Sequence, residues 1–289
     1  MIDVFITHYL DGTPGSRHMN ALLVDQITWT RATTEKPFRT TVVYYASDIS
    51  AEAEMLGMLP PDVRAVRNDR VGRTDIQPSL RNKVVDLMRV SDADFCVLLH
   101  NDVRVARGWL DVLEADLEYA ERDSGAPAIV SPRHVPYHKR ADDEALWDEF
   151  KLNPNILTPA QMRVFCAQHG FHMQGIEVLC PSWGPPIRNG HQLMMWAARP
   201  ETVRRLGYCD ERYTGTCYDD SDWGMRALLT GLASYSSQSA LIGHVAGMSY
   251  GIFSGHQPTI NERVFKAKWG TSVFDELQSG SIWPRLQTW

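Results

Sequence analysis

The densest group of acidic side chains in this 289-residue sequence consists of Asp219, Asp220 and Asp222. Three close carboxylates repel one another unless a cation, an arginine or a shared proton relieves the repulsion. The dipole at a helix N-terminus favours acids by about 0.3–1 kcal/mol each, but capping a helix needs only one of them. The cluster therefore indicates a functional site in which Asp220 or Asp219 acts as a general base toward a hydroxyl group.

A second candidate site, Asn101 and Asp102, follows a run of apolar residues. Carboxylate and amide oxygens are hard ligands that suit Mg²⁺ or Mn²⁺, and these ions commonly bridge protein carboxylates to substrate phosphates. A nucleotide diphosphate is the natural partner of such an ion. The sequence contains neither the GxGxxG dinucleotide fingerprint nor a GxxxxGK[ST] phosphate loop, so a metal would have to neutralise more of the phosphate charge.

A third candidate is Asp48, which follows the apolar residues 41–45. A carboxylate at the end of a strand can accept hydrogen bonds from a base or a ribose, as acids in dinucleotide-binding folds do. Aspartate is also common in turns and caps, because its side chain bonds to nearby backbone amides. Both interpretations of Asp48 stay open at this stage.

Alternating strands and helices are predicted to position these carboxylates. Apolar patterns predict strands at 3–7, 41–45, 64–67, 95–99, 128–131, 192–197 and 239–245, and helices at 17–31, 79–88, 108–121, 200–207, 223–231 and from 259 onward. Ser79 is the predicted N-cap of the second helix, and residues 259–262 form a predicted capping box. Repeated strand–helix units without hairpin signals favour a Rossmann-like α/β fold, a mostly parallel open sheet between helices. Ligands of such sheets bind at the carboxyl ends of the strands.

Residues 132–190 interrupt this pattern with seven prolines, which indicates a loop-rich insertion. Its aromatic residues and histidines either line an acceptor pocket or form a small core of their own.

Composition narrows the class of protein. The 29 basic and 35 acidic residues give a net charge of −6, so no overall positive field favours a nucleic-acid partner. No stretch approaches the roughly 20 apolar residues of a membrane span, and the N-terminus lacks a secretory signal pattern. The five cysteines contain no CxxC pair and are predicted to be reduced thiols of a cytoplasmic protein.

Several short motifs occur in a fixed order along the chain: Leu98–Val103 with Gly108–Leu110, then Gly207–Tyr213, then Asp219–Arg226 with Gly231. Together they resemble the successive motifs of family 2 type glycosyltransferases with the GT-A fold. Each motif is weak alone, and their order and spacing make the resemblance specific. It extends from Ile2 to about Gly270.

The resemblance implies an inverting, metal-assisted transfer of a sugar from a nucleotide-diphosphate sugar to a hydroxyl of a glycan, protein or small molecule. It assigns the catalytic base to Asp220, with Asp219 as the alternative, and Mn²⁺ or Mg²⁺ to Asp102 and His244. Predicted donor contacts are Thr7, Asp48, Arg81, Asn82, Asn101 and Lys268, the last in a segment resembling a phosphate-contacting closing element; predicted acceptor contacts are Trp183 and Asp222.

Two departures from the family pattern are visible. His100 stands where the usual Asp-x-Asp metal motif has its first acid, which leaves one carboxylate, and Asp219 stands where glutamate is common. The predicted organisation has a donor half (1–131), an acceptor-side insertion (132–190), a catalytic half of the same domain (191–270) and a C-terminal tail (271–289).

Three other classes of protein are compatible with these residues. A nucleotidyltransferase also uses a metal-bound carboxylate in an α/β crevice, but it would release pyrophosphate. A glycosyltransferase acting on DNA bases is disfavoured by the negative charge. A non-catalytic protein that binds nucleotide sugars would show binding without turnover.

Overall fold

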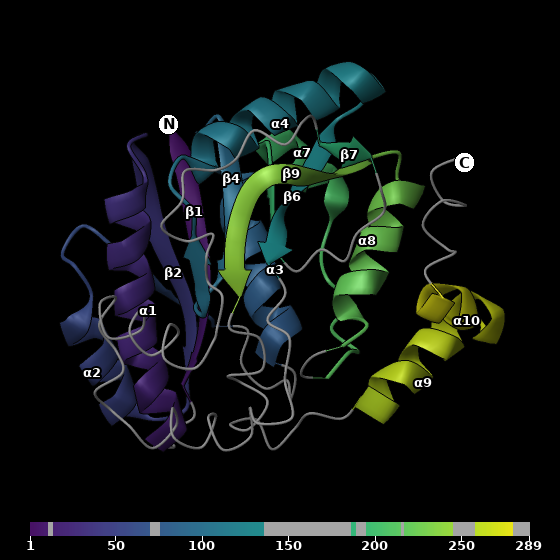
Figure 1. Cartoon of the computed structure of the whole chain (residues 1–289). Helices are drawn as coiled ribbons and strands as arrows, with labels where there is room; N and C mark the ends of the chain where they lie inside the picture. The colour runs from purple at the N-terminus through teal and green to yellow at the C-terminus, as the bar shows by residue number, and fades with distance from the viewer. Residues whose placement is uncertain are drawn as a thin grey trace.

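Nine strands of the described part of the chain form one sheet (Figure 1). The computed structural model describes residues 1–10, 14–69, 76–135, 186–188, 195–214, 217–244 and 258–279, so most of the predicted insertion lies outside it. The strands are β1 (Ile2–Leu10), β2 (Phe38–Ala46), β3 (Arg64–Arg67), β4 (Phe95–His100), β5 (Val103–Val105), β6 (Ala128–Val135), β7 (Ile187–Arg188), β8 (Trp196–Ala198) and β9 (Ala233–His244). Their order is β3-β2-β1-β4-β8-β6-β9-β5, and β7 pairs with β9.

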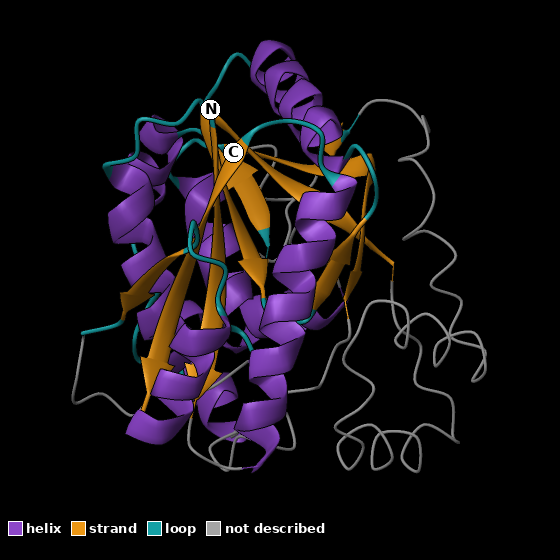
Figure 2. Ribbon diagram, turned by 90° about the vertical axis from the view of Figure 1, so that its left-hand side faces the viewer, coloured by secondary structure: helices purple, strands orange, loops and turns teal. Residues whose placement is uncertain are grey.

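Helices cover both faces of the sheet (Figure 2). The helices of the described ranges are α1 (Pro14–Thr33), α2 (Ile49–Met58), α3 (Ile76–Arg89), α4 (Trp109–Ser124), α7 (Pro200–Leu206), α8 (Asp219–Leu229), α9 (Pro258–Trp269) and α10 (Thr271–Ser279). Apolar residues of α1, α2 and α4 share one core with the sheet. Those of α3, α7 and α8 share a second core on the opposite face.

The alternation of side chains along β1 explains the two cores. Val4 and Ile6 point into the core with α1 and α4, whereas Phe5 points into the core with α3. Successive strand residues face opposite sides of a sheet, and apolar residues on both sides require helices on both sides. The pairings leave six of the nine described strands running in one direction, and the predicted mostly parallel α/β sheet is confirmed.

Four local predictions differ from the structure. The predicted strand 192–197 is β8, described from Trp196 to Ala198, and it runs antiparallel between β4 and β6. Helix α2 was not predicted. Ser79 lies inside α3, where its hydroxyl accepts a hydrogen bond from Asn68 instead of capping the helix. Helix α9 begins at Pro258, so residues 259–262 are not a capping box. The Ser79 hydroxyl thus serves a tertiary contact that local sequence does not reveal.

Helices α9 and α10 form a third packed layer beside α8 (Figure 1). Phe265, Phe274 and Leu277 are buried there against Tyr213 and Met225. Part of the predicted C-terminal tail is therefore a packed helix. None of the described helices has the length and apolar character to cross a membrane, and no disulfide bond joins the cysteines of the described ranges.

Candidate active site

Arg81 of α3 joins two groups of predicted site residues. One guanidinium nitrogen, Nη1, forms an ion pair with Oδ2 of Asp219, the first residue of α8. The other, Nη2, lies 3.5 Å from Nε2 of His100, the last residue of β4. Residues 100 and 219 are far apart in the sequence, yet one buried arginine contacts both. The acids of α8 and the carboxyl end of β4 therefore form one site.

Asp219 and Asp220 have different surroundings within this site. Both are buried, with 1% and 7% of their surface exposed. Burial raises the pKa of Asp220 to about 6; the charge of Asp219 acts in the same direction, and Arg81 opposes it. Asp219 itself is held by the ion pair with Arg81. Asp220 is thus the acid whose pKa lies closest to neutral pH, and such a pKa suits a general base.

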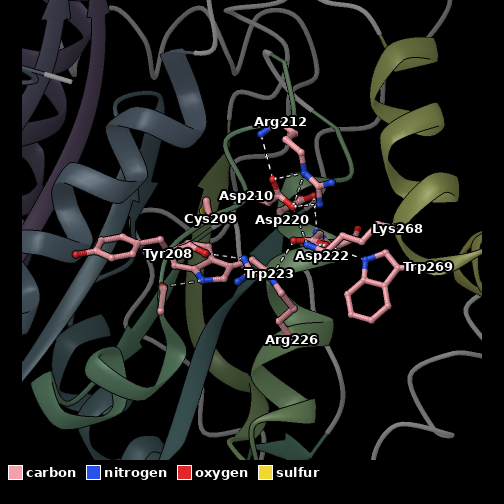
Figure 3. Close-up of polar contacts among 12 residues, drawn as sticks. Tyr208, Cys209, Asp210, Arg212, Asp220, Asp222, Trp223, Arg226, Lys268 and Trp269 are labelled. Atoms are coloured by element: carbon pink, nitrogen blue, oxygen red, sulfur yellow. Dashed lines mark hydrogen bonds and ion pairs between the residues drawn. The ribbon is translucent and has the colours of Figure 1, made fainter. Parts of the chain in front are cut away.

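Asp222 lies one turn further, in a polar cluster between α8 and α9 (Figure 3). Its carboxylate is 0% exposed. It accepts from Nε of Arg226 at 3.0 Å and from Nε1 of Trp269 at 2.7 Å, and it lies 2.6 Å from Nζ of Lys268. These contacts give Asp222 a role in fixing α9 to α8, and its predicted acceptor contact stays a prediction.

Lys268 also reaches Asp210, in the loop that precedes α8 (Figure 3). Nζ of Lys268 lies 2.8 Å from Oδ2 of Asp210, and the guanidinium of Arg212 pairs with the same carboxylate. These cations, Arg212 first, hold the pKa of Asp210 below its usual range. The ammonium group of Lys268 is therefore engaged by two carboxylates, and its predicted contact with donor phosphate stays a prediction.

A short chain of hydrogen bonds fixes Asn101. Nδ2 of Asn101 lies 2.6 Å from Nδ1 of His8, and Nε2 of His8 lies 2.9 Å from Oδ1 of Asn20. Burial lowers the pKa of His8 to about 4, so the ring is neutral at pH 7. A neutral imidazole has one donor and one acceptor, which here means that Nε2 donates and Nδ1 accepts. His8 was not among the predicted site residues. The feature that could have revealed it is a titratable side chain that directly follows an apolar strand pattern.

The two predicted metal ligands lie close together in the sheet topology: Asp102 immediately precedes β5, and His244 is the last residue of β9. Val103 of β5 pairs with His244 of β9, so Asp102 directly precedes the residue opposite His244. The Asp102 side chain is buried, and the side chain of His244 lies outside what the structure describes. A carboxylate before β5 and a histidine paired opposite Val103 are residue types that suit a divalent cation. Within the described ranges, no three His, Cys, Asp or Glu residues gather as metal ligands.

Thr7 and Asp48 lie at the carboxyl ends of β1 and β2. Thr7 pairs in register with His100 of β4, which places it at the same end of the sheet as the site. Oδ1 of Asp48 accepts hydrogen bonds from the backbone amides of Ser50 and Ala51, at 2.7 and 3.2 Å, and caps α2. The capping interpretation of Asp48 thus describes its local contacts, and its predicted nucleoside contact stays a prediction.

Asn82 of α3 holds the loop that follows α7. Its Nδ2 donates to the carbonyl of Cys209 at 3.1 Å and to the carboxylate of Glu211 at 2.8 Å, while its Oδ1 accepts from the amide of Cys209 at 2.7 Å. Asn82 is buried. Its observed contacts therefore position the loop, and its donor contact stays a prediction. Trp183 lies outside the described residues.

The strand order, the helices on both faces and the acids at the carboxyl ends of the strands define a GT-A type fold. A crystal structure of GalNAc-T7 with UDP, GalNAc and Mn²⁺ has a TM-score of 0.55 and 14% identity to this chain. The match covers 92% of this chain and 48% of that one, so this chain spans about half the length of GalNAc-T7. This likeness confirms the predicted fold.

Two other solved structures are similar at lower scores. S. aureus TarS (residues 1–349) has a TM-score of 0.48 and 10% identity, and the match covers 94% of this chain and 74% of that one. Glucosyl-3-phosphoglycerate synthase from Mycobacterium tuberculosis, with Mn²⁺, UDP and glucosyl-3-phosphoglycerate, has a TM-score of 0.45 and 11% identity, and the match covers 84% of this chain and 71% of that one. No family model matches the sequence. No curated protein matches it either.

Proposed function

We propose that this chain is a glycosyltransferase that moves a sugar from a nucleotide-diphosphate sugar to an acceptor hydroxyl, with inversion at the anomeric carbon. One observation carries the proposal: buried Arg81 joins the acids at the start of α8 to the carboxyl end of β4. That end of an open α/β sheet is where ligands bind, and the raised pKa of Asp220, about 6, supports its proposed role as the base. The GT-A fold supports the same reaction class by analogy.

In the proposed reaction, Asp220 takes the proton of the acceptor hydroxyl. The acceptor oxygen forms a bond to the anomeric carbon while the bond from that carbon to the diphosphate oxygen breaks, and the nucleoside diphosphate leaves. A carboxylate in a buried site is a stronger base than one in water, because desolvation favours its protonated form. Asp219 and Arg81 set the charge around Asp220 and hold the first turn of α8 against β4.

On the donor side, Asp102 and His244 would hold a divalent cation, Mn²⁺ or Mg²⁺. Such an ion, when bound, neutralises charge that develops on a departing diphosphate. Asn101, oriented by His8, together with Thr7 and Asp48, would contact the nucleotide. Trp183 of the insertion is the proposed stacking residue for the acceptor.

The test begins with a thermal-shift screen of nucleoside diphosphates with Mn²⁺, which selects the nucleotide. Release of nucleoside diphosphate from the matching sugar donors is then measured for wild type and Asp220→Asn, with water or added hydroxyl compounds as acceptors. Loss of a general base costs typically 10²–10⁴-fold in rate, so we expect a fall in that range for Asp220→Asn. The matched control is Glu118→Gln on α4, on the opposite face of the sheet from α8.

Near wild-type transfer by Asp220→Asn would refute the assignment of the base. Release of pyrophosphate instead of nucleoside diphosphate would identify a nucleotidyltransferase, and binding without turnover would identify a non-catalytic protein.

A further inference from the structure

The backbone just before the two site acids is strained. Cys217 and Tyr218 both have positive φ angles, 86° and 65°, and Tyr218 is the N-cap of α8. Residues other than glycine rarely adopt this left-handed conformation, because the Cβ atom crowds the backbone. Two such residues in succession persist only where surrounding contacts hold them, and strain of this kind clusters at functional sites. Asp219 and Asp220 follow directly.

One side chain from a distant helix holds this turn. Asn261 of α9 is fully buried. Its Nδ2 donates to the carbonyls of Thr214 and Cys217, at 2.7 and 3.0 Å. Its Oδ1 accepts from the amide and the hydroxyl of Thr214, at 2.7 and 3.2 Å. An asparagine amide has two donor hydrogens and two acceptor lone pairs, and all four are used here.

Other contacts from α9 and α10 support the same segment. The ring of Tyr218 packs against Phe265 and Phe274, with ring centroids 5.9 and 5.5 Å apart. One turn into α8, the carboxylate of Asp222 is bound by Lys268 of α9 (Figure 3). Helices α9 and α10 therefore contact three parts of this segment: the turn before the acids, the N-cap residue of α8, and the first turn of α8.

We propose that Asn261 is a positioning residue for the catalytic base: it holds the left-handed turn at Cys217 and Tyr218, which sets the direction of Asp220. The inference rests on the proposed function for the role of Asp220. Asn261 is more than 40 residues from Asp220 in sequence and reaches this segment through its hydrogen bonds to Thr214 and Cys217. A displacement of about 1 Å at a reacting group can cost about 100-fold in rate.

The experiment compares wild type, Asn261→Asp and the control Arg263→Ala, an exposed position on the same helix. The aspartate keeps the acceptor oxygen for Thr214 but loses both donors and turns a carboxylate toward the two carbonyls. For Asn261→Asp we expect kcat to fall about 10- to 100-fold while the donor KM changes less than about threefold. Amide hydrogen exchange in residues 214–222 should rise at least tenfold at a temperature well below unfolding. Arg263→Ala should behave as wild type.

Two further measurements separate positioning from general loss of structure. Cys217→Gly in the Asn261→Asp background removes the strain at residue 217, so we expect it to restore part of kcat. The second measurement is the pH profile of Asn261→Ala, which loses the same hydrogen bonds without adding a charge: its acid limb should move down as Asp220 gains solvent. The charged groups that face Asp220 are Asp219 of its own helix and Arg81 of α3, which in turn contacts His100 of β4, and all of them are unchanged in Asn261→Ala.

An unchanged exchange rate in 214–222, or a fall of kcat that only follows the loss of folded protein, would overturn the proposal. If Asn261→Asp does not fold, the wild-type amide of Thr214 decides, because its protection depends on Oδ1 of Asn261 and unprotected exchange would refute the contact. If wild type transfers no sugar from any donor, the proposed function is wrong, and Asn261 then cannot be called a positioning residue for a catalytic base. The exchange data would then still show separately whether Asn261 holds the turn.

Discussion

Replacing Asp219 with asparagine tests the electrostatics of the site most directly. Burial and the neighbouring charge of Asp219 together raise the pKa of Asp220 from 3.8 to about 6, against the opposing charge of Arg81. At 1.36 kcal/mol per unit, this difference corresponds to about 3 kcal/mol between the protonated and ionised forms. The Asp219→Asn change removes a negative charge while keeping the shape of the side chain, and it leaves Arg81 to act on Asp220 alone.

The expected change follows from these causes. Burial is the larger cause and persists in the variant, so we expect the pKa of Asp220 to fall by about one unit, or about 1.4 kcal/mol. A base with a pKa near 6 is about 10% ionised at pH 5, whereas one with a pKa near 5 is about 50% ionised. Activity at pH 5 relative to the plateau should therefore rise about fivefold in Asp219→Asn. The plateau itself should fall, because a weaker base accepts the proton less readily.

The assay is the pH dependence of kcat/KM for nucleoside diphosphate release between pH 4.5 and 8.5, which reports ionisation in the free enzyme. Asp220→Asn, which should lose the acid limb together with most of the rate, is the reference. Glu118→Gln should keep the wild-type profile. An acid limb of Asp219→Asn at or above the wild-type pH would refute the assignment, because it would mean that Asp219 does not raise the proton affinity of the base.

Three further predictions concern other contacts. Arg81→Leu leaves the buried carboxylate of Asp219 without its ion-pair partner and should lower the free energy of unfolding by about 3–5 kcal/mol in urea titrations. A decrease below about 1 kcal/mol would contradict a buried ion pair, and Arg81→Lys should lower the free energy of unfolding less than Arg81→Leu does. Burial lowers the pKa of His8 from 6.5 to about 4, so between pH 6.5 and pH 4 this histidine binds a proton in the unfolded chain but not in the folded one. The free energy of unfolding should therefore be highest above pH 6.5 and should fall by about 3 kcal/mol as the pH drops to 4. Urea titrations of His8→Gln should lack this part of the slope, and equal slopes would refute it. Asp102→Asn should weaken Mn²⁺ binding in the presence of nucleoside diphosphate at least about tenfold by calorimetry, and unchanged affinity would remove Asp102 as a ligand.

Much of the fold could be predicted from local patterns, because burial on two faces leaves a clear record in the sequence. The apolar run Phe95–Leu99 predicted a central strand, and all five residues are fully buried in β4. The apolar residues within 3–7 and the apolar stripe of residues 108–121 likewise predicted β1 and α4. The antiparallel direction of β8 was not predictable, because three apolar residues can pair equally well with a parallel or an antiparallel neighbouring strand.

The acids at the start of α8 could be predicted to form a site from their number and mutual repulsion alone. Which of them is suited to act as the base depended on Arg81, which reaches α8 from α3 and pairs with Asp219, leaving Asp220 with the raised pKa. The contacts of Asp222 with Arg226 and Lys268 are likewise visible only in the folded chain, and the predicted contact of Asp222 with an acceptor stays a prediction.

The sequence by itself determined the types of side chain available and the strand ends that carry them, because these follow from local periodicity and residue chemistry. Only the tertiary structure decided how they are paired and oriented, because the partners come from distant helices. Arg81 and Asn261 lie on α3 and α9, far from the acids of α8 in the sequence, and no local pattern connects them. Their contacts exist only when the sheet has brought the helices together.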